Sequence, residues 1–210
     1  MLRKETITPS ILKLIVSLQE KSWLNDFFLV GGTGLALQLG HRKSDDIDFF
    51  TTTDFNQEEI LQYLESDYRF QLDLIDNNTL KGTIDRVKID LLSHKYPLIN
   101  PLITMEGIRL ASKADISAMK INAISNDGTR VKDFIDLFYL LHDFSVDQLL
   151  GFYSKKYTLR NSMHALKSMN FFDDVVVEGW PEMVRDKSLT WKRIMKYIDK
   201  SCRDYAKSLS

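Results

Sequence analysis

The segment 27–50 restricts the fold more than any other, because it joins a glycine turn to two closely spaced aspartates. Phe27–Val30 is a short apolar run that predicts a strand, and Gly31-Gly32 ends it. We expect a short helix over Thr33–Leu39, with Thr33 as its N-cap residue. A second strand is predicted over Asp46–Phe50, so the order is strand, turn, helix, loop and strand.

This segment fits a site for phosphate and metal. A glycine turn that enters a helix N-terminus lets the backbone N–H groups of Gly31, Gly32 and Thr33 approach a phosphate. Side chains alternate along a strand, so Asp46 and Asp48 share one face about 7 Å apart, near enough to share divalent cations. A phosphate cradle beside a carboxylate pair indicates metal-assisted phosphoryl or nucleotidyl transfer. The alternative is a solvated strand that carries two aspartates.

The loop before the second strand adds candidate phosphate ligands. The Arg42 guanidinium is suited to neutralise phosphate charge, and the Ser44 hydroxyl to bind a phosphate oxygen or to orient Asp46. A solvated loop is the alternative for Arg42, Lys43 and Ser44, and we favour it for Lys43.

Composition limits the class of protein. The chain has 210 residues, 44% of them hydrophobic, so a substantial core is available. The formal net charge of −1 means that binding to a polyanion needs a local patch. The single cysteine, Cys202, excludes an intramolecular disulfide and suits a reducing compartment. The N-terminus lacks the apolar region of a signal peptide, and no apolar run reaches the roughly 20 residues that span a bilayer, so we expect a cytoplasmic protein without a membrane segment.

The chain changes character near residue 111, from mixed to all-helical. Before it, helices are predicted at 9–18 and 57–64, capped by Thr8 and Asn56, and strands at 70–74, 80–84, 86–92 and 108–110, with a loop over 94–104. The alternation at 70–74 predicts a half-buried strand. After it, only helices are predicted, at about 113–125, 130–142, 146–156, 159–170 and 190–208. We expect an α+β fold: a mixed-sheet core with flanking helices at 1–110, and a helical C-terminal domain at 111–210 that completes the active-site cleft.

Asp90 is a candidate third carboxylate. Val87, Ile89 and Leu91 share one face of the predicted strand, so Asp90 points to the other. If this strand neighbours that of Asp48, three carboxylates converge and are able to hold two metal ions about 3.5–4 Å apart. An aspartate on a solvated sheet face is the alternative.

Lys120 interrupts an apolar stripe. Ile116, Met119, Ala123 and Ile124 follow the helical period, and Lys120 occupies the missing position between them. A lysine on a buried face needs an anion, which a phosphate or a site carboxylate would supply. The alternative is a lysine whose stem runs past the edge of the core to water.

Asp133 and Asp136 form a polar streak on a helix that is otherwise apolar on nearly every side. Their place near its N-terminus is favoured by the helix dipole, which is a sufficient structural explanation. A helix this apolar is nevertheless expected to be buried, so its carboxylates need partners. Lys120, Arg130 or a bound nucleotide would serve.

The last predicted helix carries a basic ridge opposite its apolar stripe. The ridge comprises Lys192, Lys196, Lys200, Arg203 and Lys207. It suits an RNA backbone, although we favour a solvated face. The four histidines show no metal-ligand spacing.

The motif GGTGLALQLGHRKSDDIDF at 31–49 closely resembles the first motif of the AbiEii/AbiGii-type nucleotidyltransferase toxins, members of the DNA polymerase β-like nucleotidyltransferase superfamily. The resemblance continues in VKIDLL at 87–92, DISAMKINAI at 115–124 and RVKDFIDLFYLL at 130–141, and so covers about residues 8–142. It implies that Asp46 and Asp48 match the metal-binding pair, Lys120 the essential lysine, and either Asp133 or Asp136 the last essential acid.

The resemblance also implies a function. It implies a nucleotidyltransferase fold. An enzyme of this kind would transfer a nucleoside monophosphate from an NTP to an acceptor hydroxyl, with two Mg²⁺ ions and release of pyrophosphate. Family members are toxins of toxin–antitoxin pairs that act in growth arrest and phage defence, and some modify the tRNA acceptor end. A tRNA acceptor and a cognate antitoxin are therefore the expected partners. The alternatives are a non-catalytic module that binds a nucleotide or partner on the same fold, and a small-molecule nucleotidyltransferase of the antibiotic-modifying type.

Overall fold

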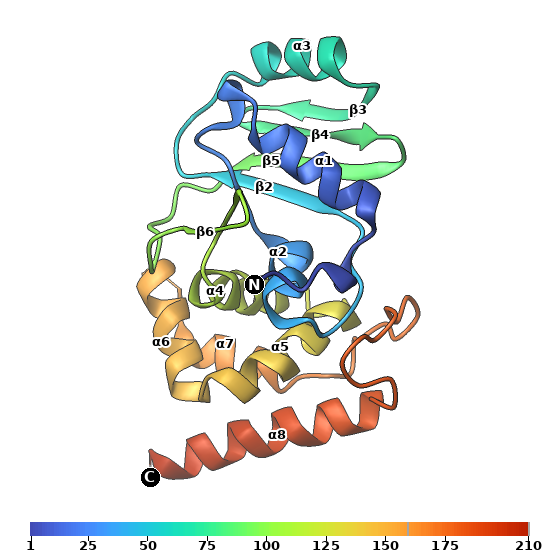
Figure 1. Ribbon diagram of the computed structural model, residues 1–210. Coiled ribbons are helices and arrows are strands. Elements are labelled where there is room, and N and C mark those ends of the chain that lie inside the picture. Colours follow the sequence, from blue (N-terminus) through green and yellow to red (C-terminus); the bar gives the residue numbers. More distant parts are fainter. Residues whose placement is uncertain (159, 210) are drawn as a thin grey trace.

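A computed structural model describes residues 1–158 and 160–209 of the chain (Figure 1). Its centre is a seven-stranded mixed sheet in the order β3-β4-β5-β2-β1-β7-β6. The strands are β1 (Phe28–Leu29), β2 (Ile47–Thr51), β3 (Phe70–Asp76), β4 (Thr79–Ile84), β5 (Val87–Ser93), β6 (Ile103–Met105) and β7 (Ile108–Leu110). β2 runs parallel to β5 and antiparallel to β1, while β1 runs parallel to β7. The strand predicted over Asp46–Phe50 is β2, which therefore lies at the middle of the sheet.

The helices follow the predicted ones closely. They are α1 (Pro9–Gln19), α2 (Gly31–Leu39), α3 (Gln57–Asp67), α4 (Lys113–Asn126), α5 (Val131–Asp143), α6 (Val146–Lys156), α7 (Ser162–Met169) and α8 (Trp191–Ser208). The side chains of Thr8 and Asn56 cap α1 and α3 as expected. The helix predicted at 159–170 begins at a residue outside the described part of the chain, and α7 covers Ser162–Met169 of that range. The predicted fold class is confirmed.

Three local predictions are wrong. Thr33 is not an N-cap residue, because α2 already begins at Gly31 and its cap position is Val30. The predicted loop 94–104 ends in β6, which pairs with β7 as a short hairpin. β3 exists and forms one edge of the sheet, but beyond Phe70 its residues are exposed rather than half-buried.

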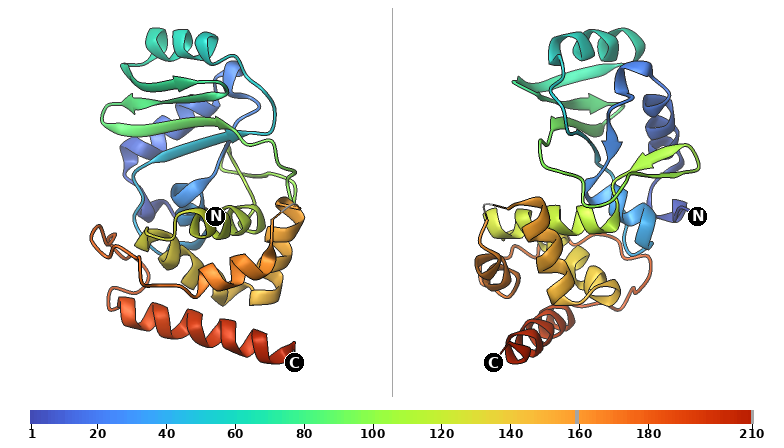
Figure 2. Two further views of the ribbon diagram at one scale, coloured as in Figure 1. Left: turned by 180° about the vertical axis from the view of Figure 1, so that it is seen from behind. Right: turned by 90° about the vertical axis from the view of Figure 1, so that its left-hand side faces the viewer.

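Two apolar cores hold the molecule together. One lies between the sheet and α1 and α3, and all its buried residues come from the range 2–110. The other lies among α4–α8 and also takes in Phe28, Val30 and Leu35 of the β1–α2 segment. Figure 2 shows α1 across one face of the sheet, whereas no described helix covers the opposite face of β3, β4 and β5. The division of the chain near residue 110 into two domains stays a prediction. In the described ranges, no helix is long and apolar enough to cross a bilayer.

Candidate active site

Two carboxylates lie side by side at the middle of the sheet. β2 and β5 pair in parallel with Asp48 opposite Asp90, so both side chains point to the same face. Asp46 precedes β2 by one residue and points into the same space. These three aspartates help to line a pocket of about 350 Å³. The sequence-based condition for a third carboxylate, that the strands be neighbours, is met.

The N-terminus of α2 opens onto this pocket. Gly31 and Gly32 both line it, and the first N–H groups of a helix have no acceptor within the helix. Gly31 has a positive φ of 64°, and a Cβ atom built on it would lie 1.9 Å from Asp48 Oδ2. A side chain at this position is therefore excluded by backbone conformation and by the carboxylate. The close approach leaves the N–H groups and the carboxylate exposed to one shared space.

We expect Gly31→Ala to destabilise the protein by more than the roughly 1–2 kcal/mol that a left-handed alanine costs, and to impair the pocket. The additional cost arises because the methyl group displaces Asp48. Gly107→Ala is a matched control, since Gly107 has a φ of 80° but no heavy atom within 4 Å of its built Cβ. Urea unfolding of both variants measures the difference. Equal losses would show that the Asp48 contact is unimportant.

Lys120 supplies the positive charge opposite the carboxylates. Its ammonium lies 2.7 Å from Asp133 Oδ1 and 2.7 Å from Asp136 Oδ2, so the lysine on the apolar stripe is paired, as predicted, with carboxylates of the next helix. Burial alone would lower the pKa of Lys120, but Asp136 and Asp133 raise it above its ordinary value. The ammonium is therefore held as a fixed cation at the pocket wall.

The structure separates the two aspartates of α5. Asp133 lines the pocket, and its buried Oδ2 has no hydrogen-bond partner within the described residues. Asp136 does not line the pocket and is fully buried. It accepts hydrogen bonds from His41 Nε2 at 2.8 Å and from Arg42 Nε and Nη2 at 2.7 and 2.9 Å. Burial favours protonation of Asp136, but Arg42 and Lys120 hold its pKa well below its ordinary value.

Arg42, Ser44 and Thr33 lie behind the pocket rather than on its wall. Arg42 is 2% exposed and its guanidinium is engaged by Asp136, so the expected direct phosphate contact is not present in this conformation. The Thr33 hydroxyl donates to the carbonyl of Asp46 and lies 2.9 Å from Ser44 Oγ, within hydrogen-bond distance. These three residues therefore fix the loop that leads into the aspartates.

The electrostatics of the pocket centre on Asp48. Burial raises its pKa from 3.8 to about 6, and Asp90 and Asp46 add to this, while Lys120 and Arg130 oppose it. Asp90 is partly neutralised by Lys81, whose ammonium lies 2.7 Å from Oδ2. Within residues 1–158 and 160–209, no three His, Cys, Asp or Glu side chains form a ready-made metal site. A cation would therefore need oxygen atoms from a substrate as well.

Among the pocket-lining residues that sequence reasoning did not assign to the site are Phe50, Lys88, Met119 and Arg130. Lys88 and Phe50 were detectable, because each lies two residues from an aspartate on the same strand face. Met119 and Arg130 reach the pocket only through the packing of α4 and α5 against α2.

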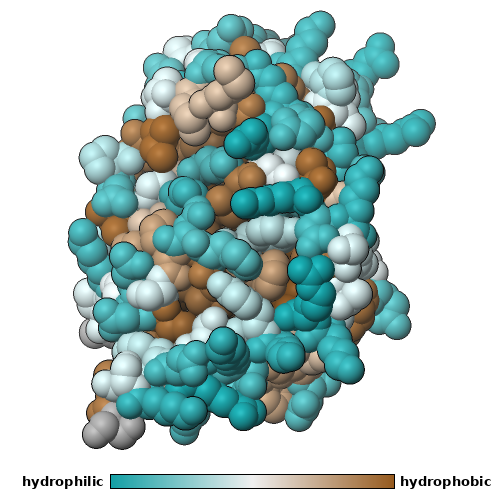
Figure 3. Space-filling model, turned by 60° about the horizontal axis from the view of Figure 1, so that its bottom comes forward, coloured by the Kyte–Doolittle hydropathy of each residue, from teal (hydrophilic) through white to brown (hydrophobic). Residues whose placement is uncertain are grey.

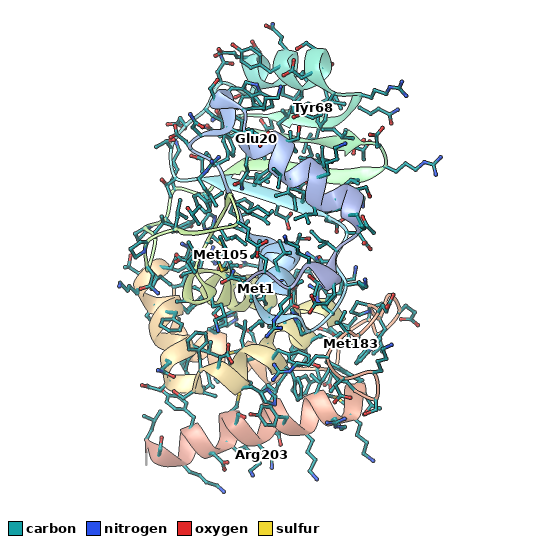
Figure 4. All side chains as sticks on the ribbon, viewed as in Figure 1. Met1, Glu20, Tyr68, Met105, Met183 and Arg203 are labelled. Carbon is teal, nitrogen blue, oxygen red and sulfur yellow. The ribbon has the colours of Figure 1, made fainter. Side chains whose placement is uncertain are left out.

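The basic ridge of α8 is remote from the pocket. Its residues Lys192, Lys196, Lys200, Arg203 and Lys207 are exposed, whereas Ile194, Ile198 and Cys202 face the core. α8 lies at the end of the molecule furthest from the sheet (Figure 1), and teal hydrophilic side chains cover most of that end (Figure 3). Arg203 points outward from the helix (Figure 4) and donates to Asp199 at 2.8 Å.

Comparison with known proteins gives a class for this arrangement of sheet, glycine turn and carboxylates. MenT4, a nucleotidyltransferase toxin from Mycobacterium tuberculosis H37Rv, matches with a TM-score of 0.57 and 14% identity over 90% of this chain and 78% of that one. A protein from H. pylori matches with a TM-score of 0.59 and 18% identity over 95% and 93% of the two chains. The fold is that of the nucleotidyltransferases.

The sequence identifies the family. The model for the family described as "Nucleotidyl transferase AbiEii toxin, Type IV TA system" matches residues 13–73. An uncharacterized protein of Aquifex aeolicus (strain VF5) is 32% identical over 187 residues, which cover 86% of this chain and 88% of that protein. The chain belongs to the AbiEii nucleotidyltransferase toxin family, and the resemblance of its first motif is confirmed.

Proposed function

We propose that this protein is a Mg²⁺-dependent nucleotidyltransferase that moves a nucleoside monophosphate from an NTP to an acceptor hydroxyl, as the toxin of a toxin–antitoxin pair. One observation carries the proposal: the Asp48–Asp90 pair, the N-terminus of α2 and the Lys120 ammonium all face one pocket. Each element suits a different part of the reaction, and the three come from segments far apart in the sequence.

The donor set of the pocket fits Mg²⁺. This ion prefers carboxylate oxygens and is commonly held by one or two carboxylates together with substrate phosphates. Asp46, Asp48 and Asp90 would hold it, and the absence of a side chain at Gly31 lets the Asp48 carboxylate lie directly against the N-terminus of α2. When bound, the metal would withdraw charge from the triphosphate and lower the pKa of the acceptor hydroxyl.

The side chains divide the remaining work. The N–H groups of Gly31 and Gly32 bind triphosphate oxygens, and Lys120 stabilises the charge that develops as the α-phosphorus is attacked. Asp90 is placed to take the proton of the acceptor hydroxyl. Asp133, whose Oδ2 accepts no hydrogen bond from the described residues, contacts the nucleotide, whereas Asp136 positions Lys120 and Arg42 from behind.

The acceptor that we favour is the 3′ end of an RNA, with tRNA as the first candidate, and a cognate antitoxin would complete the pair. This choice rests on the family. On the same ground we propose that the protein acts in the cytoplasm and has a role in phage defence. A small molecule is the alternative acceptor. A non-catalytic binding module is the rival of another class.

A labelling experiment tests these proposals together. The protein is incubated with each α-³²P-labelled NTP, Mg²⁺ and total tRNA, and the products are separated into RNA, protein and small molecules. We expect label on RNA, no label with γ-³²P-labelled NTP, and no reaction in EDTA. Label on another acceptor would refute the RNA assignment, and no transfer to any acceptor would favour the binding module.

A further inference from the structure

A row of aromatic rings continues the carboxylate face of the sheet. Phe50 follows Asp48 by two residues on β2 and lines the pocket. His94 follows Asp90 by four residues, and its backbone N–H donates to the carbonyl of Thr51 at 2.7 Å. The centroids of the Phe50 and His94 rings are 5.3 Å apart, and those of His94 and Tyr96 are 4.7 Å apart. The row runs from the pocket wall outward to Tyr96, whose side chain is 39% exposed.

The inner side of this row is rigidly held. The Tyr157 hydroxyl lies 3.1 Å from His94 Nε2, and Tyr157 is itself 1% exposed. The rings of Tyr96 and Tyr157 meet edge to face at 4.6 Å. Burial lowers the pKa of His94 to about 4, and Lys156 adds to this, so the imidazole stays neutral near pH 7. Packing accounts for Tyr157, but the exposed surface of Tyr96 contributes nothing to the core.

The surroundings indicate which ligand suits the row. Aromatic side chains that are held rigid and partly exposed stack nucleobases of single-stranded nucleic acids. Lys81 and Lys88 lie on the same uncovered face of β4 and β5, where Lys81 pairs with Asp90 and Lys88 lines the pocket. They provide charge for backbone phosphates. The helix N-terminus for the triphosphate lies on β1–α2, so Asp90, Lys88 and His94 of the β5 segment are on the acceptor side.

We propose that Phe50, His94 and Tyr96 form a stacking platform for the terminal nucleobases of the acceptor, which holds the acceptor hydroxyl toward Asp90. This site rests on the proposed transferase function, but it makes a separate claim about binding. Nothing in the metal or triphosphate site requires aromatic rings at these positions. The platform would bind bases of any kind, because stacking does not read hydrogen bonds.

Fluorescence anisotropy tests the platform without any transfer reaction. The probes are a 12-nucleotide single-stranded RNA with a 5′ fluorescein and the same RNA with its last two nucleotides abasic. Tyr96→Ala should weaken binding of the intact RNA about 5- to 100-fold and leave binding of the abasic-ended RNA unchanged. Tyr96→Phe keeps the ring and should bind like the wild type. Tyr63→Ala is the matched control, because Tyr63 is 38% exposed and stacks on Trp23 outside the pocket.

Several outcomes would overturn the platform. The first is equal binding of the two RNAs by the wild type. The second is an equal loss of affinity for both RNAs in Tyr96→Ala. The third, from a parallel titration with a non-hydrolysable NTP analogue, is that Tyr96→Ala loses affinity for the analogue alone. The last result would place the donor base on the row. Failure of the proposed function gives a different result from failure of the platform. Base-dependent RNA binding without nucleotide transfer would support the platform and contradict the transferase function. Base-independent RNA binding with nucleotide transfer that does not depend on Tyr96 would support the transferase function and contradict the platform.

Discussion

Replacement of Asp136 by alanine should cost about 3–5 kcal/mol of folding free energy, a large part of the total stability of a typical domain. Asp136 is fully buried, and the hydrogen bonds and ion pair that it makes with His41, Arg42 and Lys120 are all 2.9 Å or shorter. Its removal leaves two buried cations without their main counter-charge. The large cost therefore reflects uncompensated charge as much as lost hydrogen bonds.

Asp133→Ala is the matched control for this prediction. Asp133 lies on the same helix and is 2% exposed, but its one close ion pair in the described part of the chain is with Lys120, and its other oxygen has no hydrogen-bond partner there and lies 3.8 Å from Arg130 Nε. Urea unfolding should show a clearly smaller loss for Asp133→Ala, while nucleotide transfer should fall sharply in both variants. If the two substitutions destabilise the protein equally, Asp136 is not the centre of the charge cluster.

Asp48→Asn should abolish nucleotide transfer and at the same time stabilise the protein at neutral pH. Loss of transfer follows because the amide is a poor metal ligand beside Asp46 and Asp90. Stabilisation follows because the folded-state pKa of Asp48 is raised to about 6 by burial and by its acidic neighbours. Ionised Asp48 therefore destabilises the fold, fully above pH 6 and hardly at all below its ordinary value of 3.8.

The expected gain for Asp48→Asn is about 1–3 kcal/mol at pH 7.5, and it should vanish near pH 4. Urea unfolding at both pH values, without divalent metal, measures it. Added Mg²⁺ should then stabilise the wild type but not the variant, because only the wild type binds the ion strongly. Transfer activity of the variant above about 1% of wild type would exclude Asp48 as an essential ligand. A variant that is less stable than the wild type at pH 7.5 would show that ionised Asp48 does not destabilise the fold.

Local sequence patterns predicted the parts of the site that depend on local geometry. The D-x-D strand, the interrupted stripe at Lys120 and the polar streak on α5 all follow from a period of two or of 3.6 residues, which a sequence displays directly. The pairing of Lys120 with the α5 carboxylates was one of the options that the sequence left open, because a buried charge requires an opposite charge but the pattern does not say which one.

The features that the sequence did not predict depend on contacts between residues far apart in the chain. Arg42 looked like a phosphate ligand because its charge suits one, yet its partner Asp136 is 94 residues away. The register of β2 against β5 was stated only as a condition, since no local feature specifies which strands neighbour each other. The exposure of Leu72 and Leu74 on β3 was missed because alternation marks a face of a strand but does not reveal whether anything covers that face.

The ion cluster between Arg42 and Asp136 also sets a time for the assembly of the site during synthesis. A ribosome adds about 5–20 residues per second, so roughly 5–20 seconds separate the emergence of the two partners. Throughout this interval Asp136 is not available to hold the ammonium of Lys120 in place opposite the aspartates of the β2 segment. A nascent chain would therefore have no complete pocket until α5 has left the ribosome, and with the proposed RNA acceptor this delay would limit damage to the translation machinery that is making the chain.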